Sequence, residues 1–152
     1  METHYAAFGD LLHTARTGEA AATHHYGQPF FDWISADAGW SESQNLCCAD
    51  ITRSLRSGTF DGYRLPEGAA VADIGGADGT VLASLLREEP DRRGIVFDFP
   101  KVVAAAAGTA DQHGLGGRLR SVGGNFFDSV PTADVYVLSY VLHDRDDLRR
   151  CS

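Results

Sequence analysis

Three glycines and two aspartates lie within ten residues, in the stretch VADIGGADGT at residues 71–80. An apolar run precedes the glycines and a helical pattern follows them, which predicts a strand, a tight turn and the start of a helix. In an open α/β sheet such a turn lies at the carboxyl ends of the strands, where ligands bind. Glycine lets a ligand approach the backbone closely because it has no side chain. The stretch therefore predicts a site for a nucleotide-like ligand.

The spacing of the glycines narrows the class of ligand. Dinucleotide sites use G-x-G-x-x-G, whereas Gly75, Gly76 and Gly79 give G-G-x-x-G. The carboxylate of Asp73, two residues before the first glycine, would repel a pyrophosphate. The stretch contains no G-K-[ST] sequence, which excludes a Walker loop. Asp73 suits a cationic group instead, such as the ammonium of S-adenosylmethionine, and Gly75 and Gly76 leave room for that ligand.

A second acid supports the same ligand. Asp98 ends the apolar run GIVFD, 25 residues after Asp73. An acid at the end of the second strand can accept hydrogen bonds from both ribose hydroxyls, as in dinucleotide-binding folds. We therefore predict that Asp73, Gly75, Gly76 and Asp98 bind S-adenosylmethionine. A glycine turn with a purely structural role stays open as the alternative.

The elements that position these residues fall into two parts. Residues 1–65 are predicted to be helical, and the third helix there begins at Ser41, a residue suited to N-capping. Residues 66–152 alternate between strands and helices, which predicts a parallel, doubly wound sheet with helices on both faces. The first helix would carry an apolar face made of Tyr5, Phe8, Leu11, Leu12 and Ala15. Helices are expected at 3–17, 28–37, 41–57, 78–89 and 101–114, and strands at 69–75, 93–100, 117–127 and 133–143.

Composition excludes several classes of protein. The 152 residues carry a net charge of −8, so no basic face suited to nucleic-acid phosphates is evident. The chain shows neither a signal peptide nor the roughly 18 apolar residues that a membrane span needs. Its three cysteines lack disulfide or metal-ligand spacing, and the adjacent His24 and His25 do not share a helix face, so we expect no metal site. These features predict a cytoplasmic protein with no nucleic-acid or membrane partner.

Several motifs together resemble the S-adenosylmethionine-dependent O-methyltransferases that include plant caffeate enzymes and bacterial polyketide-tailoring enzymes. They are VADIGGADGTVLASLLREEPDRRGIVFDFPKVV, GRLRSVGGNFFDSVP and ADVYVLSYVLHDRDD, which together cover most of residues 69–147. The N-terminal FGDLLHTARTGEAA and YGQPFFDWI also resemble the helical segment before the catalytic domain in bacterial members. The resemblance implies a Rossmann-like S-adenosylmethionine methyltransferase fold. It also implies methyl transfer from this cofactor to a hydroxyl of a small aromatic molecule, phenolic or polyketide-like.

The resemblance also implies roles for particular residues. Phe99 would lie near the adenine of the cofactor. The family's Gly-Asp-(Phe/Met)-Phe stretch is residues 124–127 here, so that Phe126 would pack on the adenine. Asn125 stands where an acid normally accepts from the adenine amino group, and its amide oxygen can still accept that bond. Ser139 stands where some members have a lysine that contacts the cofactor.

His143 occupies the position of the family's general base, in an LHDR box where Arg145 replaces the usual tryptophan. The chemistry explains why a histidine is wanted there. A phenolate attacks the methyl group far better than a phenol, which loses its proton at about pH 10. An imidazole titrates at about pH 6.5 and can take that proton as the attack begins. The resemblance thus implies that His143 is catalytic.

The resemblance finally implies that the chain holds strands one to four of a seven-stranded sheet. It implies that three parts of the family's fold would be missing: the later strands, the acid that orients His143 and an N-terminal dimerisation region. A homodimer is nevertheless an expected assembly. Two alternatives to methyl transfer therefore stay open. The chain could be a truncated remnant that at most binds the cofactor or pairs with another chain. It could also use S-adenosylmethionine for other chemistry, such as hydroxylation or decarboxylation, given the departures at Asn125 and Arg145.

Overall fold

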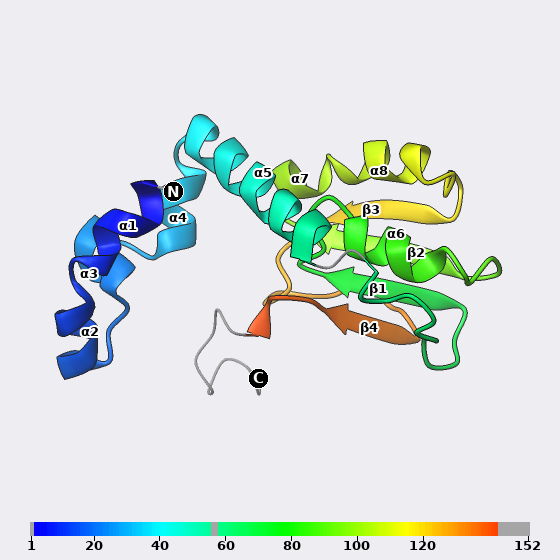
Figure 1. Ribbon diagram of the computed structural model, residues 1–152, viewed down its shortest axis with the longest axis horizontal. Coiled ribbons are helices and arrows are strands. Elements are labelled where there is room, and N and C mark those ends of the chain that lie inside the picture. The colour runs from blue at the N-terminus through cyan, green and yellow to red at the C-terminus, as the bar shows by residue number, and fades with distance from the viewer. Residues whose placement is uncertain (1, 56–57, 143–152) are drawn as a thin grey trace. The chain divides into compact units, whose positions relative to one another are not determined.

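The computed structural model describes residues 2–55 and 58–142. The chain forms two compact units, Met1–Cys47 and Cys48–Ser152. The described part of the first unit is helical, and the second contains a sheet with helices packed on it (Figure 1). Among the described residues, no helix is both long enough and apolar enough to cross a membrane.

The N-terminal unit is built from short helices, and its beginning differs from the prediction. The helix expected over 3–17 is divided because Gly9 and Asp10 form a turn, in which the Gly9 N–H donates to the Ala6 carbonyl at 3.1 Å. Glycine is a poor helix former, so a break is cheap there. Gly18 ends the second helix, as predicted, with a φ of 79°. The helices are α1 (Glu2–Phe8), α2 (Leu11–Thr17), α3 (Ala21–Tyr26), which was not predicted, α4 (Phe30–Ser35) and the start of α5 (Ala38–Leu55).

The N-terminal unit has little apolar core. Among its described residues only Ala7 and Ile34 are buried, while Tyr26 and Trp33 stack with their ring centroids 3.8 Å apart. The apolar face predicted for 3–17 does not pack within the described chain. Its aromatic and leucine members are exposed: Tyr5 by 82%, Phe8 by 59%, Leu11 by 52% and Leu12 by 60%.

The cap of α5 also differs from the prediction. The helix begins at Ala38 and not at Ser41. Asp37 supplies the cap, because its Oδ1 accepts the Trp40 N–H at 2.9 Å and its carbonyl accepts the Ser41 N–H at 3.0 Å. An aspartate satisfies the free N–H groups of a helix start as well as a serine does.

The C-terminal unit contains a parallel sheet, as predicted. Its strand order is β3-β2-β1-β4, and every neighbouring pair runs parallel. The last two strands are shorter than the predicted 117–127 and 133–143, because they pair only as far as their neighbours extend. The strands are β1 (Ala70–Ile74), β2 (Arg93–Asp98), β3 (Leu119–Gly123) and β4 (Val135–Leu138).

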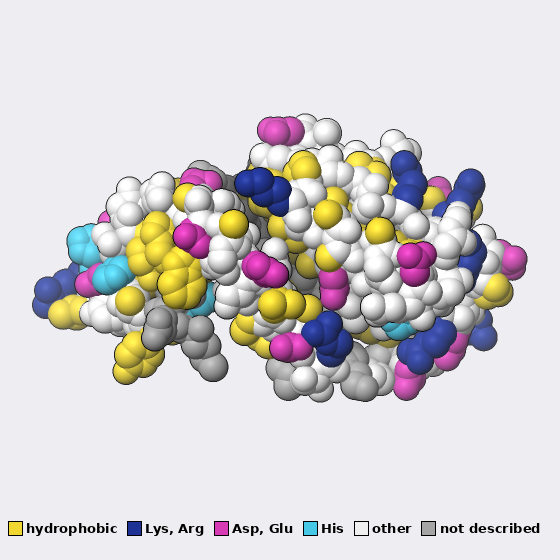
Figure 2. All heavy atoms as spheres, turned by 90° about the horizontal axis from the view of Figure 1, so that it is seen from above, with side chains coloured by type: hydrophobic (Ala, Val, Ile, Leu, Met, Phe, Trp, Pro, Cys, Tyr) yellow, Lys and Arg dark blue, Asp and Glu magenta, His cyan; other side chains and the backbone are white. Residues whose placement is uncertain are grey.

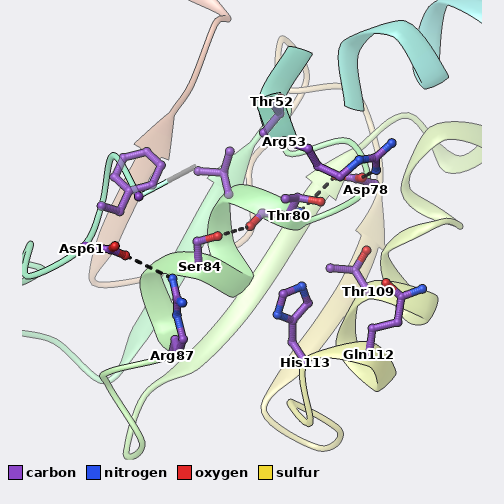
Figure 3. Close-up of a pocket in the computed structure, with 13 residues that line it drawn as sticks. Thr52, Arg53, Asp61, Asp78, Thr80, Ser84, Arg87, Thr109, Gln112 and His113 are labelled. Carbon is purple, nitrogen blue, oxygen red and sulfur yellow. Dashed lines mark hydrogen bonds and ion pairs between the residues drawn. The ribbon is translucent and has the colours of Figure 1, made fainter. Parts of the chain in front are cut away.

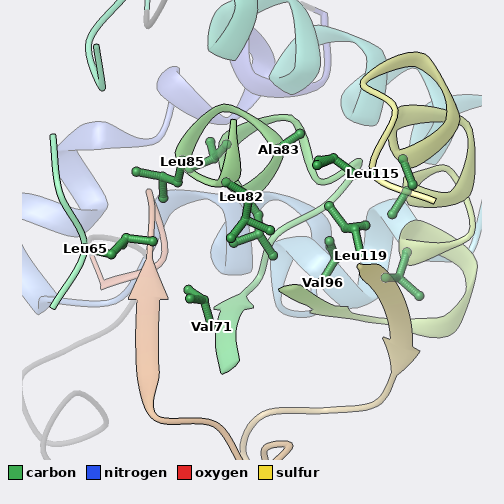
Figure 4. Close-up of a cluster of buried hydrophobic side chains, with 13 residues drawn as sticks. Leu65, Val71, Leu82, Ala83, Leu85, Val96, Leu115 and Leu119 are labelled. Atoms are coloured by element: carbon green, nitrogen blue, oxygen red, sulfur yellow. The ribbon is translucent and has the colours of Figure 1, made fainter. Parts of the chain in front are cut away.

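The described helices between these strands lie along one side of the sheet (Figure 1). They are α6 (Thr80–Leu86), α7 (Pro100–Val103) and α8 (Ala106–Gln112), the last two replacing one helix predicted over 101–114. Leu82 and Leu86 pack with Val71, Val96 and other buried side chains of the strands and α8 (Figure 4). In the described part of the sheet the helices do not cover both faces, contrary to the prediction from the sequence. The strands β1, β2 and β3 are added one after another toward the same edge of the sheet. The two right-handed crossovers that join them therefore place their helices on the same face. The connection from β3 to β4 contains no helix.

A carboxylate holds the start of β1. The Asp134 Oδ2 accepts the N–H groups of Ala69 at 2.8 Å and Ala70 at 2.9 Å. These two bonds hold the pKa of Asp134 below its ordinary value. Gly68 permits the close approach, because a Cβ there would lie 2.5 Å from the Asp134 Cβ. Asp134 thus joins the beginnings of β1 and β4.

We expect Asp134→Asn to lower the free energy of unfolding at pH 7, because two charge-assisted bonds become neutral. The lowered pKa means that this contribution is full above the unfolded value of about 3.9 and is lost as pH falls through the folded value. The urea midpoints of the Asp134→Asn variant and the unchanged protein, at pH 7 and near pH 3, measure this contribution. Asp128→Asn makes the same charge change at an exposed position and is the control. The loss should shrink at the lower pH, and an equal loss at both would contradict this role.

Candidate functional site

The carboxyl ends of the strands bring most of the predicted site residues to one edge of the sheet. Ile74, the last residue of β1, pairs with Phe97 of β2 and with Leu138 of β4. Asp98 pairs with Gly123 of β3 one residue further on. The chain leaves β1 toward β2, and β4 lies on the other side of β1, so strand order reverses there. Ligands of open α/β sheets bind at such a reversal.

The glycine turn after β1 is held by backbone bonds to β2. The N–H of Gly75 donates to the Phe97 carbonyl at 2.8 Å. Gly75 and Gly79 have φ values of 71° and 77°, a left-handed conformation that favours glycine. A Cβ at Gly75 would lie 2.7 Å from Val141, in the segment after β4. The turn therefore tolerates no side chain at this position.

The carboxylate predicted to face a cation lies against this turn. Asp73 is completely buried at the end of β1. A Cβ at Gly76 would lie 2.9 Å from the Asp73 Cγ. Gly76 is therefore needed for the close packing of the turn on a buried acid. The resulting cradle combines small residues with a carboxylate, and both features suit a cationic ligand that approaches the backbone.

Asp98 joins the glycine turn to the end of β2. Its Oδ2 accepts the Ala77 N–H at 3.0 Å, and its Oδ1 accepts the Phe99 N–H at 2.7 Å. Partial burial raises the pKa of Asp98, and these two bonds partly oppose that rise. A carboxylate has about four acceptor positions, so two remain for hydroxyl donors.

The other predicted cofactor residues lie at the same edge, in different environments. Phe99 is 45% exposed, and Ser139 directly follows β4. The Asn125 Oδ1 accepts the Phe127 N–H at 3.1 Å, which leaves that oxygen a second acceptor position. Phe126 is partly buried and packs against the apolar side chains of Ala72, Ile74, Ile95 and Phe97. The predicted catalytic residue His143, and Arg145, lie outside the described residues.

Three residues at this edge were missed by the sequence analysis. Ala77 has a φ of 47° and supplies the N–H that binds Asp98. Tyr140 has a φ of 59° just after β4, and Val141 packs against the glycine turn. Positive φ is uncommon for residues other than glycine and clusters at functional sites. No pattern in the sequence marks an alanine or a tyrosine for this conformation.

A polar pocket of about 540 Å³ lies beside α6 (Figure 3). Arg87 forms an ion pair with Asp61 at 3.4 Å, and Arg53 approaches Asp78 to 3.8 Å. The pocket thus balances two cations with two anions. Asp78, in the glycine turn, also accepts the Thr80 N–H at 3.0 Å, so the pocket adjoins the outer side of the turn. Thr52, Ser84, Thr109, Gln112 and His113 are among its other polar lining residues.

Comparison with known proteins identifies relatives over nearly the whole chain. The chain is 39% identical over 153 residues to the phenazine O-methyltransferase PhzM of Lysobacter antibioticus, covering 97% of this chain and 44% of that protein. It is 32% identical over 145 residues to the aclacinomycin 10-hydroxylase RdmB of Streptomyces purpurascens, covering 93% of this chain and 38% of that protein. The chain therefore spans less than half the length of these curated relatives.

A solved structure shows the same architecture. The O-methyltransferase NcsB1 from neocarzinostatin biosynthesis, in complex with S-adenosyl-L-homocysteine and 1,4-dihydroxy-2-naphthoic acid, matches with a TM-score of 0.86 at 35% identity. The match covers 95% of this chain and 44% of that one. The family model described as the O-methyltransferase domain matches residues 6–152. With its parallel sheet, its glycine turn and these relatives, the chain belongs to the O-methyltransferase domain family.

Proposed function

We propose that this chain is the cofactor-binding part of an S-adenosylmethionine-dependent O-methyltransferase that acts on a hydroxyl of a small aromatic molecule. One observation carries the proposal. A turn with glycines at positions 75, 76 and 79 packs on a buried acid, Asp73, and is bonded to a second acid, Asp98, at the point where strand order reverses. Relatives named as O-methyltransferases and a similar structure that holds S-adenosyl-L-homocysteine support it.

The charges and hydrogen-bond acceptors at this edge of the sheet fit the cofactor. Asp73 lies where a carboxylate can attract the ammonium of the methionine end. Gly75 and Gly76 let the turn pack closely on Val141 and Asp73 at this edge. Asp98 keeps two acceptor positions for the ribose hydroxyls. We assign the adenine to the surface formed by Phe99, Asn125 and Phe126, and we place Ser139, which directly follows β4, beside the cofactor. The bound cofactor would supply the methyl group on a positively charged sulfur.

The chain itself would contribute two things to methyl transfer: a base that takes a proton, and the positioning of the acceptor oxygen. We propose that His143 takes the proton of the acceptor hydroxyl, because a phenolate is a much stronger nucleophile than a phenol. Holding the acceptor oxygen in line with the methyl group supplies the remaining acceleration. We further propose that residues 1–65 form a helical segment of the whole protein and residues 66–152 its partial cofactor domain.

A second candidate function uses the same cofactor without methyl transfer. The similarity to a protein named as a 10-hydroxylase favours it, together with Asn125 and Arg145 at positions where the family differs. Both candidates need the cofactor site, so cofactor binding tests what they share. Formation of a methylated product distinguishes them.

Calorimetric titration of the 152-residue chain with S-adenosyl-L-homocysteine tests the proposal first. We expect saturable binding of one ligand per chain, because this chain supplies the glycine turn and both acids. Adenosine alone should bind more weakly, since it lacks the ammonium that Asp73 would attract. A folded, soluble chain that binds neither ligand would favour a remnant without cofactor function.

We expect Asp98→Asn to weaken S-adenosyl-L-homocysteine binding about tenfold or more, since hydrogen bonds to a charged group contribute roughly 1.5–3 kcal/mol. Exposed Asp91→Asn makes the same charge change elsewhere and should leave the affinity unchanged. The raised pKa of Asp98 adds a test by pH. Affinity should hold at neutral pH and fall as pH drops through the raised value, because the protonated acid loses acceptor capacity. Asp98→Asn should flatten that profile, and an unchanged profile would contradict the role.

We expect His143→Ala to leave S-adenosyl-L-homocysteine affinity nearly intact while lowering methyl transfer by roughly 10²–10⁴-fold, the usual contribution of a general base. The acceptor probe is 1,4-dihydroxy-2-naphthoic acid, which the similar NcsB1 structure holds. His113→Ala, at the end of α8, is the matched control. Equal losses of binding and transfer would mean that His143 has a structural role.

A further inference from the structure

A cluster of metal-binding side chains lies in the N-terminal unit, which the proposed function leaves without a role. His13, Glu19 and His24 each offer one ligand atom, and these atoms lie within 4.8 Å of one another. His13 belongs to α2, His24 to α3, and Glu19 to the short segment between them. Histidine side chains lie beside acidic ones on the surface that Figure 2 shows.

The three side chains already contact one another. The His13 Nε2 lies 2.6 Å from the Glu19 Oε2. The rings of His13 and His24 are stacked, with centroids 3.8 Å apart and planes 11° from parallel. Two imidazoles and a carboxylate thus converge on one small volume.

Backbone bonds fix the segment that carries Glu19. Gly18 ends α2 in a left-handed conformation, and its N–H donates to the Thr14 carbonyl at 2.8 Å. The Thr17 Oγ1 donates to the His13 carbonyl at 2.9 Å and accepts the Glu19 N–H at 3.1 Å. The turn therefore directs Glu19 back toward His13.

A second pair aligns α3 with the start of α2. The His25 Nδ1 lies 2.9 Å from the Asp10 Oδ2. The adjacent histidines therefore point to different partners, His25 to Asp10 and His24 to His13. His24 therefore has a second histidine, His13, beside it.

We propose that His13, Glu19 and His24 bind a zinc-class divalent metal ion that joins α2 to α3. Two histidines and one glutamate, with a fourth position open to water, are a ligand set typical of Zn²⁺. Bonds of about 2.1 Å to a tetrahedral ion place ligand atoms roughly 3.4 Å apart. The present ligand atoms lie within 4.8 Å of one another, and the stacked rings of His13 and His24 must turn about χ2 so that both nitrogen lone pairs face one ion. These side chains are partly or fully exposed, which leaves them room for that rotation.

The composition of the unit explains why such an ion would matter. Among the described residues of 1–47 only Ala7 and Ile34 are buried, so hydrophobic packing contributes little there. Exposed ion pairs between side chains contribute little either. An ion that binds the folded arrangement and not the unfolded chain stabilises it in proportion to its affinity and concentration.

Titration of the tag-free chain with ZnCl₂, followed by calorimetry, tests the proposal. We expect saturable binding of one ion through these residues, and a rise in thermal midpoint on saturation. His13→Ala, His24→Ala and Glu19→Gln should each weaken that binding at least tenfold. Because all three side chains are partly or fully exposed, the variants should keep the helical circular dichroism of the metal-free chain.

Matched variants separate this site from other ligands. His113→Ala removes a histidine of the other unit and should leave zinc affinity unchanged. The exposed thiols of Cys47 and Cys48 could also bind zinc, and the double variant Cys47→Ser with Cys48→Ser tests this. It should keep the zinc affinity of the unchanged chain. The spectrum of the Co²⁺-loaded chain should likewise lack a thiolate charge-transfer band. Three outcomes would overturn the proposal. They are the absence of saturable zinc binding, a zinc affinity that both histidine variants retain, and a loss of zinc affinity in the serine variant.

Discussion

The carboxylate of Asp98 is the contact on which the candidate site depends. It accepts one N–H from the glycine turn after β1, at Ala77, and another from Phe99 after β2. Two loops that leave the sheet from different strands are thereby fixed to each other. Partial burial makes this charge costly, and backbone N–H groups offset that cost by solvating it. The same group that shapes the turn is the group proposed to bind the ribose.

This arrangement requires unusual backbone conformations nearby. Gly75 and Gly79 adopt positive φ without strain, whereas Ala77 adopts it at a cost of about 1–2 kcal/mol. The packed sheet and α6 hold the turn in place, since a Cβ at Gly79 would lie 2.9 Å from Val96 in the core. Strain at Ala77 is thus sustained by burial around it, as expected where a site is organised before its ligand arrives.

The two units are stabilised in different ways. The C-terminal unit buries the apolar faces of its strands and helices in one large cluster around Leu82 and Val96. The N-terminal unit relies on aromatic stacking, as between Tyr26 and Trp33, and on polar contacts such as that of Asp10 with His25. Polar surface contacts are weak singly. A bound ion, or another protein surface that covers it, would therefore raise the stability of the N-terminal unit far more than that of the sheet.

The sequence by itself determined the alternation of strands and helices, the glycine turn and the acids Asp73 and Asp98, because these signals are local: apolar runs, glycine spacing and the residue that follows a strand. It also identified the family. Only the tertiary structure decided that α6 and α8 share one face, that Ala77 adopts a left-handed conformation to reach Asp98, and that His13 meets His24. Those features depend on contacts between segments far apart in the chain, and periodicity carries no information about such contacts.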